Sequence, residues 1–497
     1  MAPERFPSRR EFLGSVAGLV TLPAIFGGDP YRPLLRLPAP SAPVRVRGRV
    51  TGAGRGLARV AVSDGRTVVT TDRSGYFDLV ADRYRRFVTV SVPSGYQLPT
   101  HATGTARCYL PMDGAGAEMT ARFDLVPVPG GDDRHAFLAL ADIQTLDPDD
   151  VGRFRRETVP AVRQTLAELA GTPVFAVADG DIMWDRLALY DDYEAAVSEL
   201  GIPFVQVVGN HDLDLDERSD GASTTTFERR FGPRYYSFNR GQVHYVVLDD
   251  VLYYGGGYLG YVDDDQLAWL AADLAVVEPG TPVVVFTHIP LMSNFGARAG
   301  GTSTGVANWV TNRDALYRLL EPFRTTVLTG HIHESDWSDA GGVRERNLGA
   351  VCGGWWTGDI CYDGTPNGYA VVTAAGADLD WRYQATGRPA DHQLRVYPRG
   401  ADPTAPGEVV ANVWAWEPGW QVFWYEGADR RGEMARRTGL DPLAVSRQAG
   451  PDQPAKHPWV DPVPTPHLFY APVPAGATGI AVEAVDGRGR RYRATLG

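Results

Sequence analysis

Lysine is nearly missing from this sequence: Lys456 is the only one, and arginine supplies the rest of the 48 basic side chains. Aspartate and glutamate together number 60, which gives a formal net charge of −12. A chain with this excess of negative charge is poorly suited to bind nucleic acids or anionic membranes nonspecifically. We therefore expect no nucleic-acid-binding surface, and we attribute the scarcity of lysine to genomic composition.

Cysteine is scarce as well, with only Cys108, Cys352 and Cys361. Their spacing matches no zinc-binding motif. Cys352 and Cys361 flank a loop rich in glycine and tryptophan. They could form a disulfide in an oxidising compartment or remain buried thiols, and the sequence leaves both possibilities open.

Long apolar runs are also absent, and no stretch reaches the roughly 20 residues of a transmembrane helix. A short apolar stretch from Val16 to Phe26 follows Ser8-Arg9-Arg10-Glu11-Phe12-Leu13. Paired arginines before a short apolar region are typical of a twin-arginine export signal, and the alternative is a short buried helix. We expect export by the twin-arginine machinery to the periplasm, the cell surface or the medium, and no transmembrane segment.

At 497 residues the chain is too long for one hydrophobic core, so we expect about three domains. Short alternating strands first predict a β-sandwich. Strands then alternate with helices near 159–169, 267–274 and 316–320, which predicts an α/β domain. The expected boundaries are 1–28 for the signal peptide, 29–43 for a proline-rich linker, 44–128 for the β-sandwich, 133–388 for the α/β domain and 389–497 for a β-rich C-terminal domain.

The C-terminal domain is expected to contain strands at 409–414, 420–425 and 479–485, with a helix at 430–447. Its tryptophans are interpreted mainly as core residues, because large aromatic side chains dominate hydrophobic cores. The N-terminal segments Gly56-Leu57-Ala58 and Val62-Ser63-Asp64-Gly65 resemble those of carboxypeptidase regulatory-like domains. Nothing in that domain looks catalytic, so we expect it to have a packing or positioning role.

Polar side chains follow six apolar runs of the α/β domain, where strands are expected to end. Ligands gather at the carboxyl ends of strands in such folds. Aspartate, asparagine and histidine together suit two metal ions held roughly 3.5–4 Å apart, which can activate water against a phosphoester. The six strand ends carry Asp142-Ile143-Gln144, Asp179 to Asp185, Gly209-Asn210-His211-Asp212, Asp249-Asp250, His288, and Gly330-His331-Ile332-His333.

The order of these motifs over residues 135 to about 335 resembles that of the calcineurin-like metallophosphoesterases. Five motifs in sequence make a chance match very improbable. The resemblance implies a four-layer αββα sandwich flanked by the two β domains. It also implies a dinuclear centre of divalent or trivalent ions, with Fe, Mn, Zn and Co all suited to the ligands.

The resemblance also implies roles for individual residues. One metal would be held by Asp142, Asp181 and His333, and the other by Asp181, Asn210, His288 and His331. His211 would be the general acid or transition-state stabiliser, and Asp212 would orient it. The first motif departs from the family, because Gln144 stands where a histidine is usual. Gln144 could bind through its oxygen, bind through water, or leave a coordination place open.

Several residues close in sequence to these motifs have two possible interpretations. Asp179 and Asp250 are expected to cap helices. Asp185 could orient His211 or cap a helix. Arg186 could reach a substrate phosphate, although a solvated arginine is the simpler reading. The adjacent Trp355 and Trp356 could wall the pocket or pack within their loop.

The expected function is an exported, metal-dependent hydrolase of phosphoric esters, with a phosphomonoesterase slightly favoured. One alternative is a phosphodiesterase acting on nucleotide, lipid-headgroup or wall-polymer diesters. The other is a noncatalytic cell-surface binding module with a vestigial metal site. The presence of His211 and Asp212, which holding metal does not require, favours an enzyme.

Overall fold

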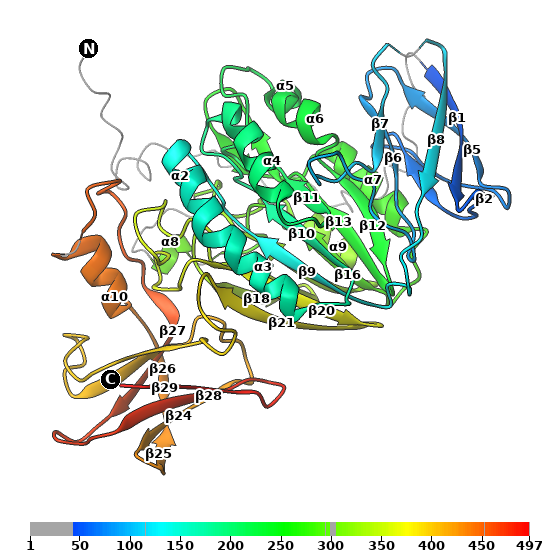
Figure 1. Ribbon diagram of the computed structural model, residues 1–497. Helices are drawn as coiled ribbons and strands as arrows, with labels where there is room; N and C mark the ends of the chain where they lie inside the picture. Colours follow the sequence, from blue (N-terminus) through cyan, green and yellow to red (C-terminus); the bar gives the residue numbers. More distant parts are fainter. Residues whose placement is uncertain (1–42, 115, 294, 299–304, 452, 497) are drawn as a thin grey trace, which may run out of the picture.

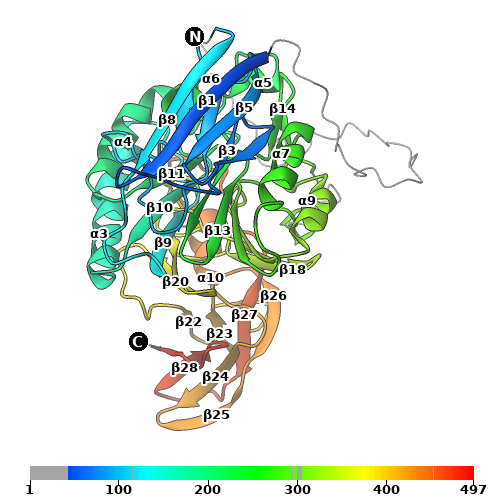
Figure 2. The same cartoon turned by 90° about the vertical axis from the view of Figure 1, so that its right-hand side faces the viewer.

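The computed structural model describes residues 43–114, 116–293, 295–298, 305–451 and 453–496. The expected signal peptide and most of the expected linker therefore lie outside the described residues. Figure 1 shows two smaller β regions at opposite ends of a larger α/β body, and Figure 2 shows the same arrangement from the side. Among the described helices, none is both long and apolar enough to cross a membrane.

Two four-stranded sheets form the N-terminal region. In the first, β1 (Pro43–Gly52) lies between β5 (Tyr76–Asp82), which is antiparallel to it, and β8 (Glu118–Leu125), which is parallel; β2 (Arg55–Gly56) extends β1 as a hairpin. The second has the order β4 (Val68–Thr70), β3 (Ala61–Ser63), β6 (Phe87–Val90), β7 (Tyr109–Pro111). Alternating buried and exposed residues along β5 and β8 show that one face of the first sheet is packed.

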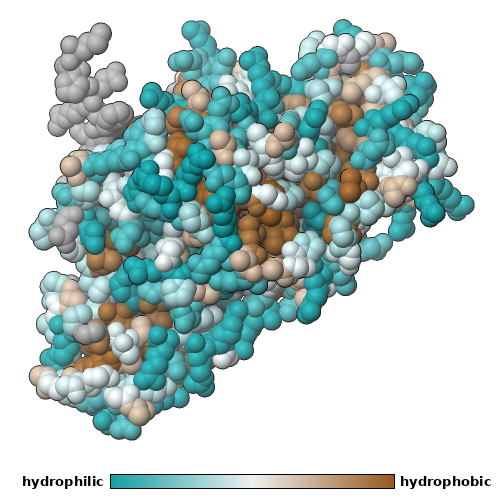
Figure 3. Space-filling view, viewed as in Figure 1, coloured by the Kyte–Doolittle hydropathy of each residue, from teal (hydrophilic) through white to brown (hydrophobic). Residues whose placement is uncertain are grey.

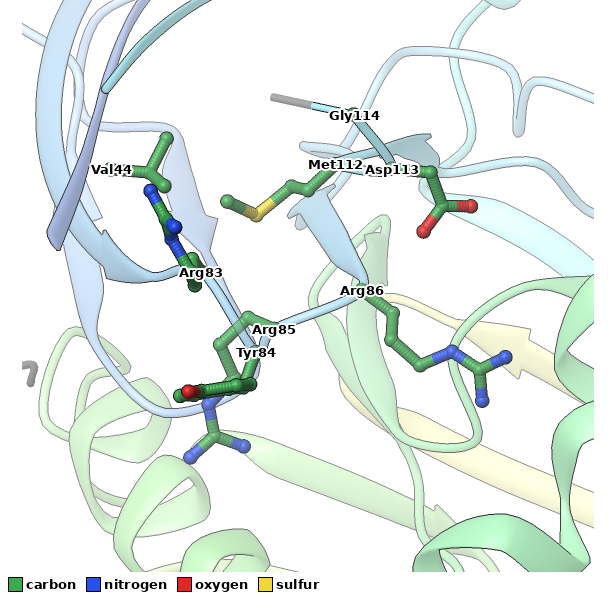
Figure 4. Close-up of a pocket in the computed structure, with 8 residues that line it drawn as sticks. All are labelled: Val44, Arg83, Tyr84, Arg85, Arg86, Met112, Asp113 and Gly114. Atoms are coloured by element: carbon green, nitrogen blue, oxygen red, sulfur yellow. The ribbon is translucent and has the colours of Figure 1, made fainter. Parts of the chain in front are cut away.

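A hollow of about 310 Å³ in this region is lined by residues of three segments, including Arg85 and Arg86 (Figure 4). The two guanidinium groups point away from each other. Arg85 pairs with Asp265 at 2.7 Å, and Arg86 pairs with Glu228. Both arginines are therefore engaged in holding the N-terminal region against the α/β body.

The α/β body contains two packed sheets. The first has the order β11 (Phe204–Val207), β10 (Val174–Asp179), β9 (Arg134–Leu140), β20 (Gly368–Ala375), β21 (Asp378–Ala385). The second has the order β12 (Tyr236–Arg240), β13 (Val243–Val247), β16 (Pro282–Phe286), β17 (Arg324–Thr329), β19 (Val343–Asn347), β18 (Asp336–Ala340). A small hairpin of β14 (Val251–Tyr253) and β15 (Tyr258–Gly260) lies beside them.

Aromatic side chains fill the space between the two sheets. Phe137 of β9 meets Phe286 of β16 with ring centroids 5.4 Å apart, and Phe175 of β10 meets Tyr245 of β13 at 5.2 Å. Helices cover the outer faces, which completes the expected four-layer α/β sandwich (Figure 2). The helical elements are α2 (Pro148–Arg153), η1 (Phe154–Thr158), α3 (Val159–Glu168), η2 (Leu187–Leu189), α4 (Tyr190–Ser198), α5 (Asp220–Ser223), α6 (Thr225–Phe231), α7 (Asp264–Leu274), α8 (Phe295–Arg298) and α9 (Arg313–Leu320).

Two further four-stranded sheets build the C-terminal region. One has the order β22 (Arg395–Tyr397), β23 (Glu408–Asn412), β27 (Thr465–Pro472), β26 (Ala435–Gly439). The other has the order β25 (Asp429–Glu433), β24 (Gln421–Glu426), β28 (Ile480–Val485), β29 (Arg491–Thr495). The three strands expected here are confirmed as β23, β24 and β28.

The face of the molecule seen in Figure 3 is mostly hydrophilic, with apolar patches between the polar side chains.

The helix expected at 430–447 is wrong. Residues 429–439 form the edge strands β25 and β26, and only α10 (Pro442–Ala444) and η3 (Val445–Ala449) are helical. The arginines there have high helix propensity, but tertiary contacts override it. Arg430 lies over the ring of Phe423, and Arg436 lies over that of Trp416.

Candidate metal centre

Four of the expected metal ligands meet where β10, β11, β16 and β17 end. His288 Nε2 lies 3.2 Å from Asp181 Oδ1 and 3.2 Å from Asn210 Oδ1. One ligand atom each from Asp181, His288 and His331 lies within 4.8 Å of the others. The structure therefore brings together Asp181, Asn210, His288 and His331, which were expected to hold one ion.

A second group of donors lies beside the first. His333 Nε2 is 3.5 Å from Asp142 Oδ1. The backbone N–H of His331 donates to both carboxylate oxygens of Asp142 at 3.0 Å. Asp142 and His333, expected at the other ion, are thus also neighbours.

The histidine tautomers fit metal binding. His333 Nδ1 donates to the carbonyl of Gly353 at 2.6 Å, and His288 Nδ1 donates to the carbonyl of Asp179 at 3.2 Å. In His333 this bond leaves Nε2 with its lone pair directed toward Asp142, the usual arrangement of a metal-ligating imidazole. In His288, Nε2 faces Asp181, and although burial alone would lower the pKa of His288, the Asp181 carboxylate raises it to about 10. His333 Nε2 is buried and has no hydrogen-bond partner among the described residues, as expected of an atom that a cation would engage.

The electrostatics of the cluster also suit a cation. Burial, together with the neighbouring His288, lowers the pKa of His331 to about 3, and burial lowers the pKa of His333 to about 4. Both imidazoles are thus neutral, which is the form that binds metals. Burial raises the pKa of Asp142 to about 8, because a carboxylate is poorly solvated there. A cation bound beside Asp142 would stabilise its charged form.

The backbone at the centre is strained. Asp142, Gln144, Asp181, His331 and His333 all have positive φ, between 46° and 72°. Non-glycine residues keep such conformations only where the surrounding structure enforces them, and these positions cluster at functional sites. These constrained residues all lie in the loops that follow β9, β10 and β17.

Glycine is required next to two of the ligands. A Cβ added at Gly180 would lie 2.2 Å from His288 Nδ1, and one added at Gly209 would lie 2.1 Å from the backbone nitrogen of Asp181. No side chain fits at those distances. The glycines before Asp181 and Asn210 therefore allow the close approach of the strand ends.

Asp185, and not Asp212, holds the His211 ring. His211 Nδ1 lies 2.8 Å from Asp185 Oδ1. The expected orienting role of Asp212 is wrong, because its carboxylate accepts hydrogen bonds from the backbone of Ile182, Met183 and Gly209 at 3.0 Å. Asp212 instead joins the loop after β10 to the loop after β11.

Neither Asp179 nor Asp250 caps a helix as expected. Asp250 Oδ1 accepts from the backbone N–H groups of His288 and Ile289 at 3.2 and 3.1 Å, so it fixes the loop that carries His288. Both carboxylate oxygens of Asp179 are buried and without a partner among the described residues, and burial raises its pKa well above the usual range. Asp179 also lies directly beside a candidate ligand, because its carbonyl accepts the hydrogen bond from His288 Nδ1.

The structure also bears on the other residues for which two interpretations were left open. Trp356 is buried and donates from Nε1 to the carbonyl of Ile143 at 3.0 Å, so it is a packing residue. Trp355 is only half-buried, and its ring centroid lies 5.4 Å from that of His211. Arg186 is exposed. Cys352 and Cys361 are free and buried, and the structure contains no bridge between them.

Comparison with known proteins identifies the fold and the chemistry. Three family models match in succession: the N terminal of calcineurin-like phosphoesterase at 44–128, the calcineurin-like phosphoesterase itself at 135–335, and the C terminal of calcineurin-like phosphoesterase at 345–492. The chain belongs to the calcineurin-like phosphoesterase family. Proteins of this family are hydrolases that act on phosphoesters and use a divalent metal site, and Asp181, His288 and His331 are possible ligands of such a site in this chain.

Individual relatives are more distant. "Purple acid phosphatase 15" of Arabidopsis thaliana is 28% identical over 28% of this chain and 26% of its own length, so the match spans about a quarter of that protein. "Serine/threonine-protein phosphatase CPPED1" of Bos taurus is 26% identical over 44% of this chain and 70% of its own. A dimetal phosphatase from Danio rerio is structurally similar, with a TM-score of 0.36 and 15% identity over 50% of this chain and 96% of its own.

Gln144, the departure from the family motif, turns its amide nitrogen toward the centre. Gln144 Nε2 donates to Asp181 Oδ2 at 2.9 Å, and Gln144 Oε1 accepts from the Cys352 thiol at 3.5 Å. We expect Gln144→His to raise affinity for the ion nearest Asp142 by roughly tenfold, because imidazole adds a stronger ligand. Calorimetric metal titration measures this, and unchanged affinity would contradict it. Gln144→Ala, which removes the hydrogen bonds to Asp181 and from Cys352 without adding a ligand, should bind the ion no more tightly.

Glu345 of β19 should make the stability of the phosphoesterase depend on pH. It is 2% exposed and accepts from the backbone of Leu291 and Met292, in the loop after His288, at 2.6 and 3.1 Å. Burial raises its pKa from 4.5 to about 7, so the folded state binds the extra proton. Stability should therefore fall as pH rises from about 4.5 to 7, by about 3 kcal/mol.

Thermal melts of wild type and Glu345→Gln across this pH range measure the effect. The glutamine variant should gain Tm relative to wild type as pH rises, because it cannot ionise. Asp339→Asn, an exposed change on the neighbouring strand β18, should follow wild type. A constant difference between wild type and Glu345→Gln would contradict the prediction.

Proposed function

We propose that this phosphoesterase is a phosphomonoesterase with a dinuclear centre. Asp142, Asp181 and His333 would hold one ion, with Asp181, Asn210, His288 and His331 around the other; Gln144 supports Asp181 from its amide. Two such ions, from among Fe, Mn, Zn and Co, would activate water and neutralise the phosphoryl oxygens. The proposal rests on the convergence of Asp142 and Asp181, which follow strands of one sheet, with His288, His331 and His333, which follow strands of the other.

The remaining residues would act on the leaving group. Because Asp185 binds His211 Nδ1, Nε2 is the ring nitrogen available to give a proton to the departing oxygen. The backbone N–H of His211 also donates to Asp181 Oδ1 at 2.9 Å, which fixes the histidine relative to the metal ligands. The phosphoryl group would thus be attacked on the metal side and its leaving group protonated on the His211 side.

The preference for monoesters is supported by two relatives of the chain, the purple acid phosphatase and the serine/threonine-protein phosphatase, which are both named as phosphatases. Paired assays with an aryl monophosphate and its bis-aryl diester, on metal-loaded protein, test it. We expect the monoester to have the higher kcat/KM. Faster hydrolysis of the diester would make the protein a phosphodiesterase, and elemental analysis finding one ion per chain would contradict the dinuclear centre.

We also propose that the protein is exported by the twin-arginine route, on the evidence of Arg9 and Arg10 before the apolar stretch. Replacing both arginines with lysine should retain the protein in the cytoplasm, as judged by cell fractionation. Export of this variant at the wild-type level would contradict the route.

A further inference from the structure

Four aromatic side chains from three separate segments gather beside His211. We call them the aromatic wall: Trp184, Trp355, His457 and Trp459. The ring centroids of Trp184 and Trp355 are 4.1 Å apart, those of Trp184 and His457 are 4.8 Å apart, and those of Trp355 and Trp459 are 5.2 Å apart. Of the four, only Trp355 was singled out from the sequence, because no motif links 457–459 to the strand ends.

The aromatic wall borders both halves of the site. Trp355 and Trp184 present their rings nearly edge-on to His211, at centroid distances of 5.4 and 6.2 Å. Trp355 also stacks on the His333 ring at 5.2 Å, with an angle of 20° between the planes. A group leaving on the His211 side of the metal centre would therefore meet these rings.

The aromatic wall differs from an ordinary aromatic core. All four rings are half-buried, whereas Trp356, next in sequence to Trp355, is 3% exposed. Trp355 and His457 have φ values of 59° and 53°, in the left-handed region. Bulky residues keep this conformation only under constraint, and such constraint is concentrated at functional sites.

The C-terminal region supplies two of the four residues of the aromatic wall, and it contacts the α/β body on both sides of them. Lys456, the only lysine, pairs with Asp150 of α2 and lies 3.5 Å from Asp147. The backbone N–H of Val463 donates to the carbonyl of Tyr362 at 3.0 Å. These contacts flank His457 and Trp459 on both sides, so the aromatic wall beside His211 is incomplete without the C-terminal region.

We propose, building on the phosphomonoesterase function above, that the aromatic wall is the leaving-group subsite and selects phosphoesters whose alcohol carries a planar aromatic ring. The wall has no guanidinium or ammonium group of its own, since Lys456 is paired with carboxylates, so it suits an uncharged ring. Stacking one ring on an aromatic side chain contributes about 1–3 kcal/mol, or roughly 5- to 160-fold in affinity.

The test compares benzyl phosphate with cyclohexylmethyl phosphate. Both release a primary alcohol of similar size, so the esters differ mainly in the flat π face of the ring. Wild type should prefer benzyl phosphate by roughly tenfold in kcat/KM. Trp459→Ala should remove most of this preference by slowing benzyl phosphate hydrolysis much more than cyclohexylmethyl phosphate hydrolysis, with metal content unchanged. Trp459→Phe should restore it.

Trp424→Ala is the matched control, because Trp424 is a half-buried tryptophan of the same C-terminal region that packs in another cluster. It should keep the preference. A parallel fall on both esters in Trp459→Ala, or no change on either, would overturn the subsite.

Binding of benzylphosphonate and cyclohexylmethylphosphonate, which are not hydrolysed, separates this proposal from the proposed activity. Wild type should bind benzylphosphonate more tightly, and Trp459→Ala should bind the two alike. If metal-loaded protein hydrolyses no monoester yet shows this binding difference, the phosphomonoesterase proposal fails and the aromatic wall stands. Equal binding of both phosphonates by wild type overturns the wall.

Discussion

Replacing Asp181 with asparagine is expected to remove most of the bound metal and to lower kcat/KM roughly 1000-fold. The carboxylate lies between the two donor groups: Oδ1 is 3.2 Å from His288 Nε2, and Oδ2 is 2.9 Å from Gln144 Nε2. Although burial alone would raise the pKa of Asp181, the neighbouring histidines His288 and His211 hold it below the usual range. An amide keeps the shape but loses the negative charge that two cations would share.

Elemental analysis and steady-state kinetics on the same preparations measure both effects. Asp192→Asn, which removes an exposed carboxylate on α4, should keep full metal content and activity. If Asp181→Asn kept the wild-type metal content and activity, the proposal that the Asp181 carboxylate is shared by two ions would be contradicted. The melting curve without added metal should show that the variant is folded.

His211→Ala should lower kcat roughly 100- to 10,000-fold while leaving metal content unchanged, because proton donation is lost but no metal ligand is. The loss should be larger for an alkyl ester than for a nitrophenyl ester, whose leaving group departs without a proton. Asp185→Asn should give the same pattern with a smaller loss, roughly 10- to 100-fold, because the ring loses its orienting carboxylate.

Asp212→Asn distinguishes the two candidate orienting residues. Asp212 accepts three backbone hydrogen bonds and one from Tyr190 Oη at 3.1 Å, so its loss should lower Tm without changing the dependence on the leaving group. If Asp212→Asn changed that dependence and Asp185→Asn did not, the assignment of Asp185 would be wrong. A loss of metal in His211→Ala would show that His211 is not a leaving-group residue alone.

The metal ligands could be read from the sequence because each belongs to a local pattern. Asp142, Asp181, Asn210, His288 and His331 each follow an apolar run. The parallel strands β9, β10 and β11 of one sheet and the parallel strands β16 and β17 of the other bring their carboxyl ends together. Strand order and ligand chemistry together therefore predicted the centre without any contact being known. The same reasoning predicted the α/β sandwich, because the hydrophobic periodicity of alternating strands and helices indicates which face of each element is buried.

The errors arose where side chains from different loops compete. Asp212 is the neighbour of His211 in sequence, whereas Asp185 lies 26 residues before it, and only the paths of the loops after β10 and β11 decided which carboxylate reaches the imidazole. The helix expected at 430–447 failed for a related reason. Its arginines favour a helix locally, but pairing of β26 with β27 and contacts with aromatic rings stabilise strands instead.

The sequence by itself determined the family, the fold class and the candidate metal ligands, because those depend on residue type and order along the chain. Only the tertiary structure decided that Asp185 holds His211, that Gln144 turns its nitrogen to Asp181, and that Trp459 reaches the site. Each of these depends on the distance between side chains of separate segments. Hydrophobic periodicity specifies which face a residue occupies, but it does not specify the contacts that loops make across domains.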